Sequence, residues 1–183
     1  MKSKSNIGKC FLSFLLISII SSCRITGLTN DYEKLSDKQK GIILKFKDSS
    51  TKLTNGYIYE INATQLKELI KKHDKAMVYI FTNGCSLKDC KPLNYYVDFA
   101  KKNNYKLFLV MTGYGNLQQT IEQKVDIPFF SIDSKYYSTN IRKYYTQYFE
   151  NELLDKPKNE NLNIRGNIYI FEKGNFVIVL NDL

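Results

Sequence analysis

Two apolar runs, Met77–Phe81 and Leu107–Met111, constrain the fold more than any other feature of this chain. Neither run contains a charged residue, and each is typical of a strand buried on both faces of a parallel sheet. Between them, apolar residues recur at the spacing of one helix face. These residues are Leu93, Tyr96, Val97 and Ala100. The order strand, helix, strand predicts a parallel sheet covered by helices.

The rest of the chain continues this alternation. Further strands are expected at 57–61 and 128–132, and helices at 63–73, 117–124 and 136–149. Ser36 and Gln39 form a capping-box pattern, which predicts another helix reaching about Lys47. Asn62 and Gln65 form a second such pattern at the start of the helix expected at 63–73, and Asn116 is the expected cap of the helix at 117–124. Residues 167–171 and 176–180 flank a turn sequence and predict a terminal β-hairpin. The predicted fold class is α/β: a three-layer sandwich whose central mixed sheet is mainly parallel, with an antiparallel edge.

Residues 1–22 are typical of a signal peptide instead of a folded element. Three lysines precede an apolar run at 11–20, which is too short to span a bilayer as a helix. The following Ile20-Ser21-Ser22-Cys23 resembles the lipobox of bacterial lipoproteins, and this resemblance implies that Cys23 carries diacylglycerol and a further fatty acyl chain such as palmitate. The alternatives are an ordinary signal peptide or a marginal membrane anchor, with Cys23 incidental.

Removal of residues 1–22 would change the net charge of the chain and leave one domain of ordinary size. The leader holds three of the 27 Lys and Arg residues and none of the 18 acidic ones, so its removal lowers the formal net charge from +9 to +6. We expect residues 23–56 to comprise the lipidated Cys23, a polar tether and an N-terminal extension. Residues 57–183 are expected to form one domain. The basic residues are scattered, and with an export signal this argues against nucleic acid as a partner.

Cys85 and Cys90 are the two thiols left for chemistry. They follow the first apolar run, where α/β folds place their functional groups. Residues five apart in a helix are separated by about 7.5 Å along its axis, beyond the roughly 7 Å that a disulfide allows between Cα atoms. The pair therefore forms a static disulfide outside an intact helix, or it cycles between two states. With no histidine nearby, we expect neither a metal nor a cofactor.

The elements around Cys85 and Cys90 resemble those of the thioredoxin superfamily. The strand, turn, cysteine and helix of 77–100 are similar to its redox motif, and 164–175 is similar to its terminal hairpin. Ile127–Asp133 resembles a segment inserted in membrane-anchored thiol–disulfide oxidoreductases and peroxiredoxins. The resemblance covers about 57–181. It implies a thioredoxin-like fold with an extra strand and helix, and the sequence departs from the family in having no final helix.

Two subfamilies compete for the activity. The Thr82, Cys85 and Cys90 spacing resembles the peroxiredoxin Q class, in which Cys85 attacks peroxide, Cys90 resolves, and Thr82 and Arg165 position the peroxide. The proline that precedes the threonine in that class is missing. Cys90 followed by Pro92 and Leu93 resembles thioredoxin-type oxidoreductases instead, but these carry C-x₂-C, a cis-proline, a tryptophan and a buried acid, which this sequence lacks.

Three functions follow as expectations. The first is thiol–disulfide exchange with a protein partner, in which Cys85 attacks and Cys90 resolves. The second is a non-catalytic thioredoxin-like binding protein with a structural disulfide, and the third is a thiol peroxidase. In each case the protein is expected in the cell envelope, attached by Cys23 to the inner or outer membrane and facing the periplasm.

Overall fold

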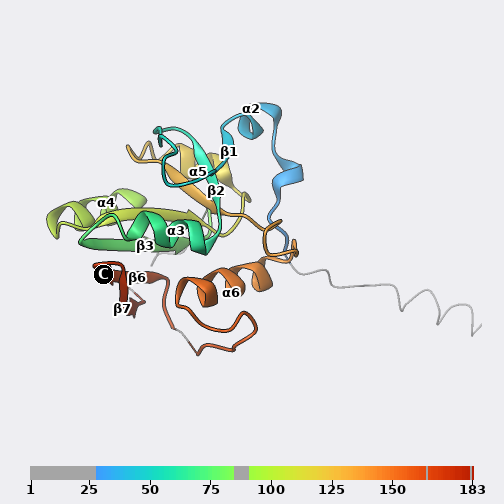
Figure 1. Ribbon diagram of the computed structural model, residues 1–183. Helices are drawn as coiled ribbons and strands as arrows, with labels where there is room; N and C mark the ends of the chain where they lie inside the picture. Colours follow the sequence, from blue (N-terminus) through green and yellow to red (C-terminus); the bar gives the residue numbers. More distant parts are fainter. Residues whose placement is uncertain (1–27, 85–90, 164, 182) are drawn as a thin grey trace, which may run out of the picture.

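The computed structural model describes residues 28–84, 91–163, 165–181 and 183, and in these the chain forms one seven-stranded sheet with helices on both faces (Figure 1). The helices are the 3₁₀ helix η1 (Tyr32–Lys34), α2 (Asp37–Lys40), α3 (Ala63–Ile70), α4 (Leu93–Lys102), α5 (Leu117–Ile121) and α6 (Arg142–Leu153). The strands are β1 (Ile43–Lys45), β2 (Ile58–Ile61), β3 (Lys75–Phe81), β4 (Lys106–Met111), β5 (Phe129–Ile132), β6 (Ile168–Glu172) and β7 (Asn175–Leu180). The predicted α/β class is confirmed.

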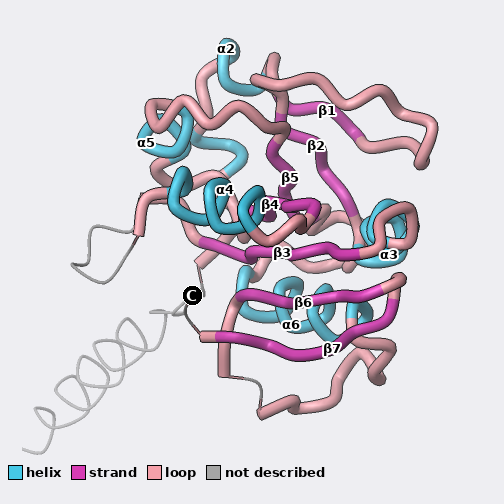
Figure 2. Tube along the Cα trace, turned by 90° about the vertical axis from the view of Figure 1, so that its left-hand side faces the viewer, coloured by secondary structure: helices cyan, strands magenta, loops and turns pink. Residues whose placement is uncertain are grey.

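The sheet is mixed, with strand order β1-β2-β5-β4-β3-β6-β7 (Figure 2). The first five strands in this order run parallel, β6 runs antiparallel to β3, and β7 runs antiparallel to β6. The predicted combination of a mainly parallel sheet with an antiparallel edge is therefore confirmed. Because five strands are parallel, their carboxyl ends meet at one end of the sheet, where open α/β sheets place ligands.

Two apolar cores lie on the two faces of the sheet. Val78 and Ile80 of β3 belong to the core formed with α3 and α6, whereas Met77 and Phe81 belong to the core formed with α4 and α5. All four side chains are buried. Successive side chains of a strand point to opposite faces, so a strand covered on both sides must be apolar at almost every position. That requirement explains the unbroken run at 77–81.

The expected N-caps of α3 and α5 differ in the structure. Asn62 and Gln65 form a reciprocal capping box at the start of α3, as the sequence predicted. Asn116 stands before α5 with a left-handed backbone (φ 56°), and its side chain makes no capping hydrogen bond. The expected cap at Asn116 is therefore wrong, although the helix itself forms close to its predicted place.

The helix predicted from Ser36 to about Lys47 is wrong beyond its first turn. Its capping box with Gln39 is present, but α2 ends at Lys40. The chain then extends into β1, which pairs in parallel with β2, with Ile43 opposite Ile58. Backbone pairing with β2, fifteen residues further along the chain, overrides the helical pattern of this segment, and the segment's own sequence carries no signal of that pairing.

The helix predicted at 136–149 forms as α6 but starts and ends later. The carboxylate of Asp133 accepts hydrogen bonds from the backbone N–H groups of Lys135 and Tyr136, and Ser138 adopts a left-handed backbone (φ 56°). Asp side chains compete in this way with helical backbone bonding. The turn they form delays the helix to Arg142.

None of the helices in the described ranges is both long enough and apolar enough to cross a membrane. The predicted leader and the predicted lipidation site, Cys23, lie outside the described residues. The predicted absence of a final helix stays a prediction.

Candidate functional site

The residues predicted for catalysis fall at one end of the sheet or beyond the described part. Cys23, Cys85 and Cys90 lie outside the described residues. Thr82 directly follows β3, is exposed, and has its hydroxyl oxygen 3.0 Å from that of Thr112, the residue after β4. Arg165 is exposed before β6, and within the described residues no hydrogen bond or ion pair joins it to Thr82. The geometry therefore places Thr82 at the carboxyl end of β3. Arg165 precedes the start of β6, which pairs with the end of β3 (Ile168 opposite Tyr79), so Arg165 lies at the same end of the sheet.

A buried amide fixes the chain after Thr82. Asn83 is only 5% exposed, and its side-chain NH₂ donates to the carbonyl of Gly113 over 2.7 Å. The hydroxyl of Thr120 donates to the Asn83 side-chain oxygen, also over 2.7 Å. Satisfied buried polar groups of this kind hold one conformation, because leaving either partner unpaired costs about 1–3 kcal/mol. The carboxyl ends of β3 and β4 and the helix α5 are joined by this one side chain.

Gly84 completes the turn and precedes Cys85. Its φ is +70°, a conformation that side chains with a Cβ rarely adopt. A Cβ at this position would lie 2.5 Å from the Cβ of Asn116. The sequence position directly before Cys85 is therefore fixed by both backbone conformation and contact with the α5 side of the sheet.

Arg142 is the functional candidate that the sequence analysis missed. It is the first residue of α6, and its guanidinium donates to the Asp31 carboxylate at 3.0 Å and to the Thr29 carbonyl at 2.8 Å. It also packs on Gly113, where an added Cβ would lie 2.9 Å from one guanidinium nitrogen. Glycine at 113 thus leaves room for the cation.

The Asp31 carboxylate forms ion pairs with two cations, Arg142 and Lys34. The Lys34 ammonium is 2.8 Å from Asp31, and its hydrogen bond, followed by the charges of Lys34 and Arg142, lowers the pKa of the carboxyl group although partial burial raises it. Two cations face one carboxylate, so the local charge is positive. Positive charge near the turn before Cys85 favours an anion such as a thiolate.

Two cavities open at this end of the sheet, and Thr82 and Arg142 line both of them. The smaller, of about 420 Å³, lies between the N-terminal segment and the start of α5. The larger, of about 740 Å³, lies along α6. Besides the two shared residues, the larger cavity is lined by Leu28, Thr112, Ile141, Lys143, Tyr144, Thr146, Gln147, Glu150 and Asn161.

A half-buried acid, Glu150, lines the larger cavity. Burial raises the pKa of Glu150, which lies next to the phenol of Tyr169. Burial, and after it the charge of Glu150, also raises the pKa of Tyr169. Within the described residues the hydroxyls of Tyr169 and Thr146 are buried without a hydrogen-bond partner. A carboxyl group that keeps its proton at higher pH than usual can donate it to a ligand in the cavity.

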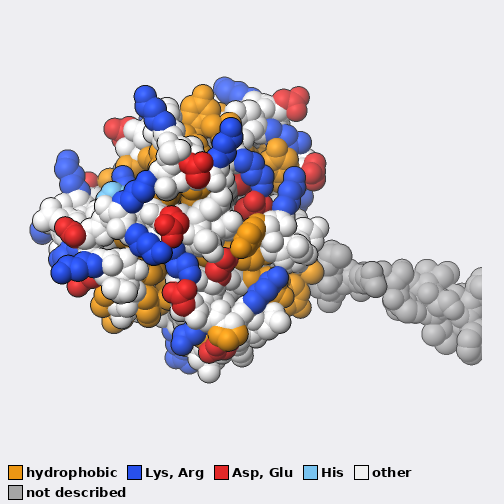
Figure 3. Space-filling view, in the orientation of Figure 1, with side chains coloured by type: hydrophobic (Ala, Val, Ile, Leu, Met, Phe, Trp, Pro, Cys, Tyr) orange, Lys and Arg blue, Asp and Glu red, His pale blue; other side chains and the backbone are white. Residues whose placement is uncertain are grey.

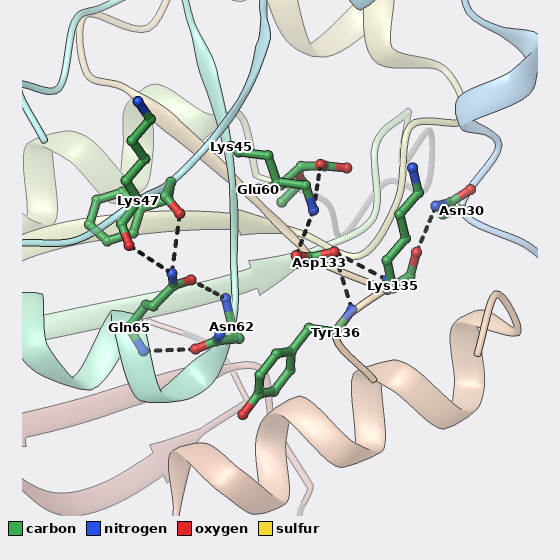
Figure 4. A network of polar contacts seen from close by, with 12 residues as sticks. Asn30, Lys45, Lys47, Glu60, Asn62, Gln65, Asp133, Lys135 and Tyr136 are labelled. Atoms are coloured by element: carbon green, nitrogen blue, oxygen red, sulfur yellow. Dashed lines mark hydrogen bonds and ion pairs between the residues drawn. The ribbon is translucent and has the colours of Figure 1, made fainter. Parts of the chain in front are cut away.

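A second polar network lies on the β1 side of the sheet and has a structural role (Figure 4). Lys45 points between Asp133 at 2.6 Å and Glu60 at 3.2 Å. Burial alone would lower the pKa of Lys45, but its hydrogen bonds and charge contacts with the two carboxylates raise it. Glu60 also accepts a hydrogen bond from Tyr114 over 3.0 Å. This network ties the edge strand β1 to β2 and to the end of β5.

His73, the single histidine of the sequence, lies just before the amino end of β3 and therefore away from the carboxyl-end site. His73 is half-buried, its ring lies 6.1 Å from that of Phe108, and burial lowers its pKa. The described ranges hold no group of three or more His, Cys, Asp or Glu side chains placed to bind a metal ion.

Comparison with models of known families, with curated proteins and with solved structures gives no significant match for this chain. The fold defines an α/β protein with a seven-stranded mixed sheet. Its functional assignment therefore depends on the residues at the carboxyl end of that sheet.

Proposed function

We propose that this protein is a lipid-anchored, extracytoplasmic protein of thioredoxin-like fold that exchanges thiols and disulfides through Cys85 and Cys90. One observation carries the proposal. The three residues before Cys85 are held at the carboxyl end of a central parallel strand, beside two cavities, by a buried amide network. Redox-active cysteines require such a cleft, because a partner's sulfur must approach them directly.

The strand order supports the thioredoxin-like part of the proposal. The strand that leads to Cys85, β3, lies between the parallel β4 and the antiparallel β6, and the chain returns as the β6–β7 hairpin. Residues 127–133, which resemble the segment inserted in membrane-anchored oxidoreductases and peroxiredoxins, form β5 between β2 and β4. These are the arrangements that the resemblance implies.

The proposed reaction is an exchange of two sulfur–sulfur bonds. The Cys85 thiolate attacks a disulfide of the partner protein, forms a mixed disulfide and releases one partner thiolate. Cys90, once deprotonated, attacks Cys85 and releases the second partner thiolate. The partner gains two electrons and the Cys85–Cys90 pair loses two. The positive charge of Arg142 and Lys34 near the turn supports a Cys85 thiolate.

The reduction potential of the cysteine pair tests this function. We would equilibrate the mature protein with glutathione or dithiothreitol buffers and trap free thiols. A potential between about −120 and −270 mV matches known exchange proteins, whereas one below about −300 mV marks a structural bond and would overturn the exchange activity. Cys85→Ser and Cys90→Ser each remove the bond and serve as reference states.

The lipid anchor is tested separately. Mass spectrometry of the protein extracted from membranes should show a mature chain that begins at an acylated Cys23. Cys23→Ser should leave the chain unacylated and release it from the membrane fraction. A mature chain cleaved elsewhere and free of acyl groups would overturn the anchor while leaving the exchange activity open to its own test.

A binding protein with a structural disulfide is the second candidate, and the larger cavity favours it. Its volume of about 740 Å³ is within the range of small-molecule sites, and it combines apolar with polar side chains. Retained binding of a partner by a Cys85→Ser/Cys90→Ser double variant would support this function over exchange. The peroxidase alternative requires Thr82 and Arg165, so loss of peroxide turnover in Thr82→Val or Arg165→Met would support it, and a parent protein without peroxide turnover would exclude it.

A further inference from the structure

The segment that enters the described part of the chain is fixed to the carboxyl end of the sheet. We call residues 28–35 the N-terminal strap. The backbone N–H of Arg142 donates to the Leu28 carbonyl over 2.7 Å, and Thr29 forms an isolated antiparallel bridge with Ile141. The strap therefore begins beside the amino end of α6, as Figure 1 shows.

Further contacts hold the strap across the same end. The backbone N–H of Tyr114 donates to the Asn30 carbonyl over 2.7 Å, and the Asn30 side chain donates to the Ser134 hydroxyl over 2.9 Å (Figure 4). The ion pair between Asp31 and Arg142 adds a side-chain link. Backbone and side-chain bonds to three separate segments leave the strap little freedom to move away from the cavities.

The distance from this fixed point to the acylated residue is short. Cys23 precedes Leu28 by five residues. An extended chain advances by at most about 3.6 Å per residue, so these five residues reach about 18 Å at most. The headgroup layer of one leaflet is roughly 5–8 Å thick, since a bilayer of 40–45 Å contains a 30 Å hydrocarbon core. The start of the strap must therefore lie near the lipid headgroups.

The side chains beside the start of the strap suit that location. Leu28 is 74% exposed and Tyr144 is 44% exposed, and Lys143 is exposed as well; all three line the larger cavity. Tyrosine is favoured at membrane interfaces, and lysine near the surface is attracted to anionic lipids. By contrast, positive and negative side chains are interspersed over the face of the molecule drawn in Figure 3.

We infer that the strap holds the carboxyl end of the sheet, with the mouth of the larger cavity, against the lipid bilayer that carries Cys23. The inference rests on the proposed lipidation. It restricts the site to partners that present their reactive group at the membrane surface. A domain on a long flexible linker would face no such restriction.

The absence of tryptophan from the whole sequence allows a direct test. We would place a single reporter by Tyr144→Trp, beside the strap, or by Phe176→Trp, near the opposite end of the sheet. Both native side chains are 44% exposed, so the two reporters are matched in exposure. Phe176 lies opposite Phe171, which pairs with Ala76 at the start of β3. The acylated full-length proteins would be reconstituted in phosphatidylcholine vesicles with headgroup-spin-labelled lipid.

We expect the lipid spin label to quench the Tyr144→Trp fluorescence several-fold more strongly than that of Phe176→Trp. Leu28→Trp is a second reporter on the strap face and should behave like Tyr144→Trp. Equal quenching of both ends, or stronger quenching of Phe176→Trp, would overturn the orientation.

Mass spectrometry of the same samples separates the two ways of failing. If Cys23 is acylated and the strap-side reporters are not preferentially quenched, the orientation is wrong and the anchor stands. If Cys23 is not acylated, the anchor and the orientation both fall. Adding Cys23→Ser to the Tyr144→Trp protein should abolish quenching, because the chain then leaves the vesicles.

Discussion

At the scale of single residues, Arg142 joins parts of the chain that are far apart in sequence. Its bonds reach Thr29 and Asp31, which lie 113 and 111 residues away. The sequence shows Arg142 as one basic residue among 27, and no spacing motif marks it. Thr82 was found because it follows a recognisable strand and precedes a cysteine. Arg142 was missed because its role arises from long-range packing around Gly113.

The ion pair of Arg142 with Asp31 should contribute to stability. Both side chains are largely buried, at 15% and 17% exposure. The hydrogen bonds between them should therefore contribute more to stability than those of exposed ion pairs. We expect Asp31→Asn to lower the free energy of unfolding by about 1.5–3 kcal/mol, the range for hydrogen bonds to charged groups. Urea unfolding would measure this loss. Asp37→Asn, an exposed acid of the same N-terminal region, should change stability far less; equal losses would contradict the assigned role.

Glu150 should make stability depend on pH. Burial raises its pKa in the folded state, so the folded protein binds this proton more tightly than the unfolded chain. Stability is then fully present below the unfolded pKa of about 4.3 and is lost as pH rises through the folded pKa. Glu150→Gln removes this loss. We therefore expect the variant to gain stability over the parent protein at pH 7 but not at pH 4, by about 1.4 kcal/mol per unit by which the pKa of Glu150 is raised.

Urea unfolding at a series of pH values would follow that difference. Glu33→Gln is the control, since the Glu33 side chain is 92% exposed. The role assigned to Glu150 is wrong if its variant and the control show the same dependence on pH.

At the scale of elements, sequence patterns predicted those parts of the fold that local physics determines. β3 and β4 were found because burial on both faces requires unbroken apolar runs, and α3 because its capping box is local. β1 was missed because its pairing with β2 depends on residues outside its own segment. The carboxyl-end site likewise combines a feature set by its local sequence with features set by long-range packing. The position of Thr82 follows from β3, whereas the two cavities depend on how α6 and the strap pack.

The turn between β3 and Cys85 should tolerate no side chain at Gly84. Gly56 is a matched control, because its φ of +83° is similar to the +70° of Gly84, but no atom lies within 4 Å of the Cβ it would gain. Gly56→Ala should cost about 1–2 kcal/mol from backbone conformation alone. Gly84→Ala adds the clash with Asn116 and should cost clearly more. Thermal unfolding of the two variants would measure both losses, and similar values would show that the turn can shift without penalty.

At the scale of the whole molecule, the two edges of the sheet differ. β1 is three residues long and carries Lys45, whose charge and ion pairs protect that edge. β7 is six residues long and carries no charged side chain. Phe176, Val177 and Ile178 are between 44% and 52% exposed. An uncharged apolar edge strand exposes unpaired backbone groups that can pair with another chain.

We therefore expect the protein to associate through β7 as its concentration rises. A lysine on this edge opposes pairing by bringing like charges together, so Val177→Lys should reduce the association while changing the free energy of unfolding by only about 0.5 kcal/mol, as is usual for exposed positions. Val177→Thr keeps a neutral, β-branched side chain and should associate like the parent protein. Sedimentation velocity over a concentration series would compare the three proteins, each with Cys23→Ser so that acyl chains do not drive association. A parent protein that stays monomeric throughout, or a lysine variant that associates equally, would contradict association through β7.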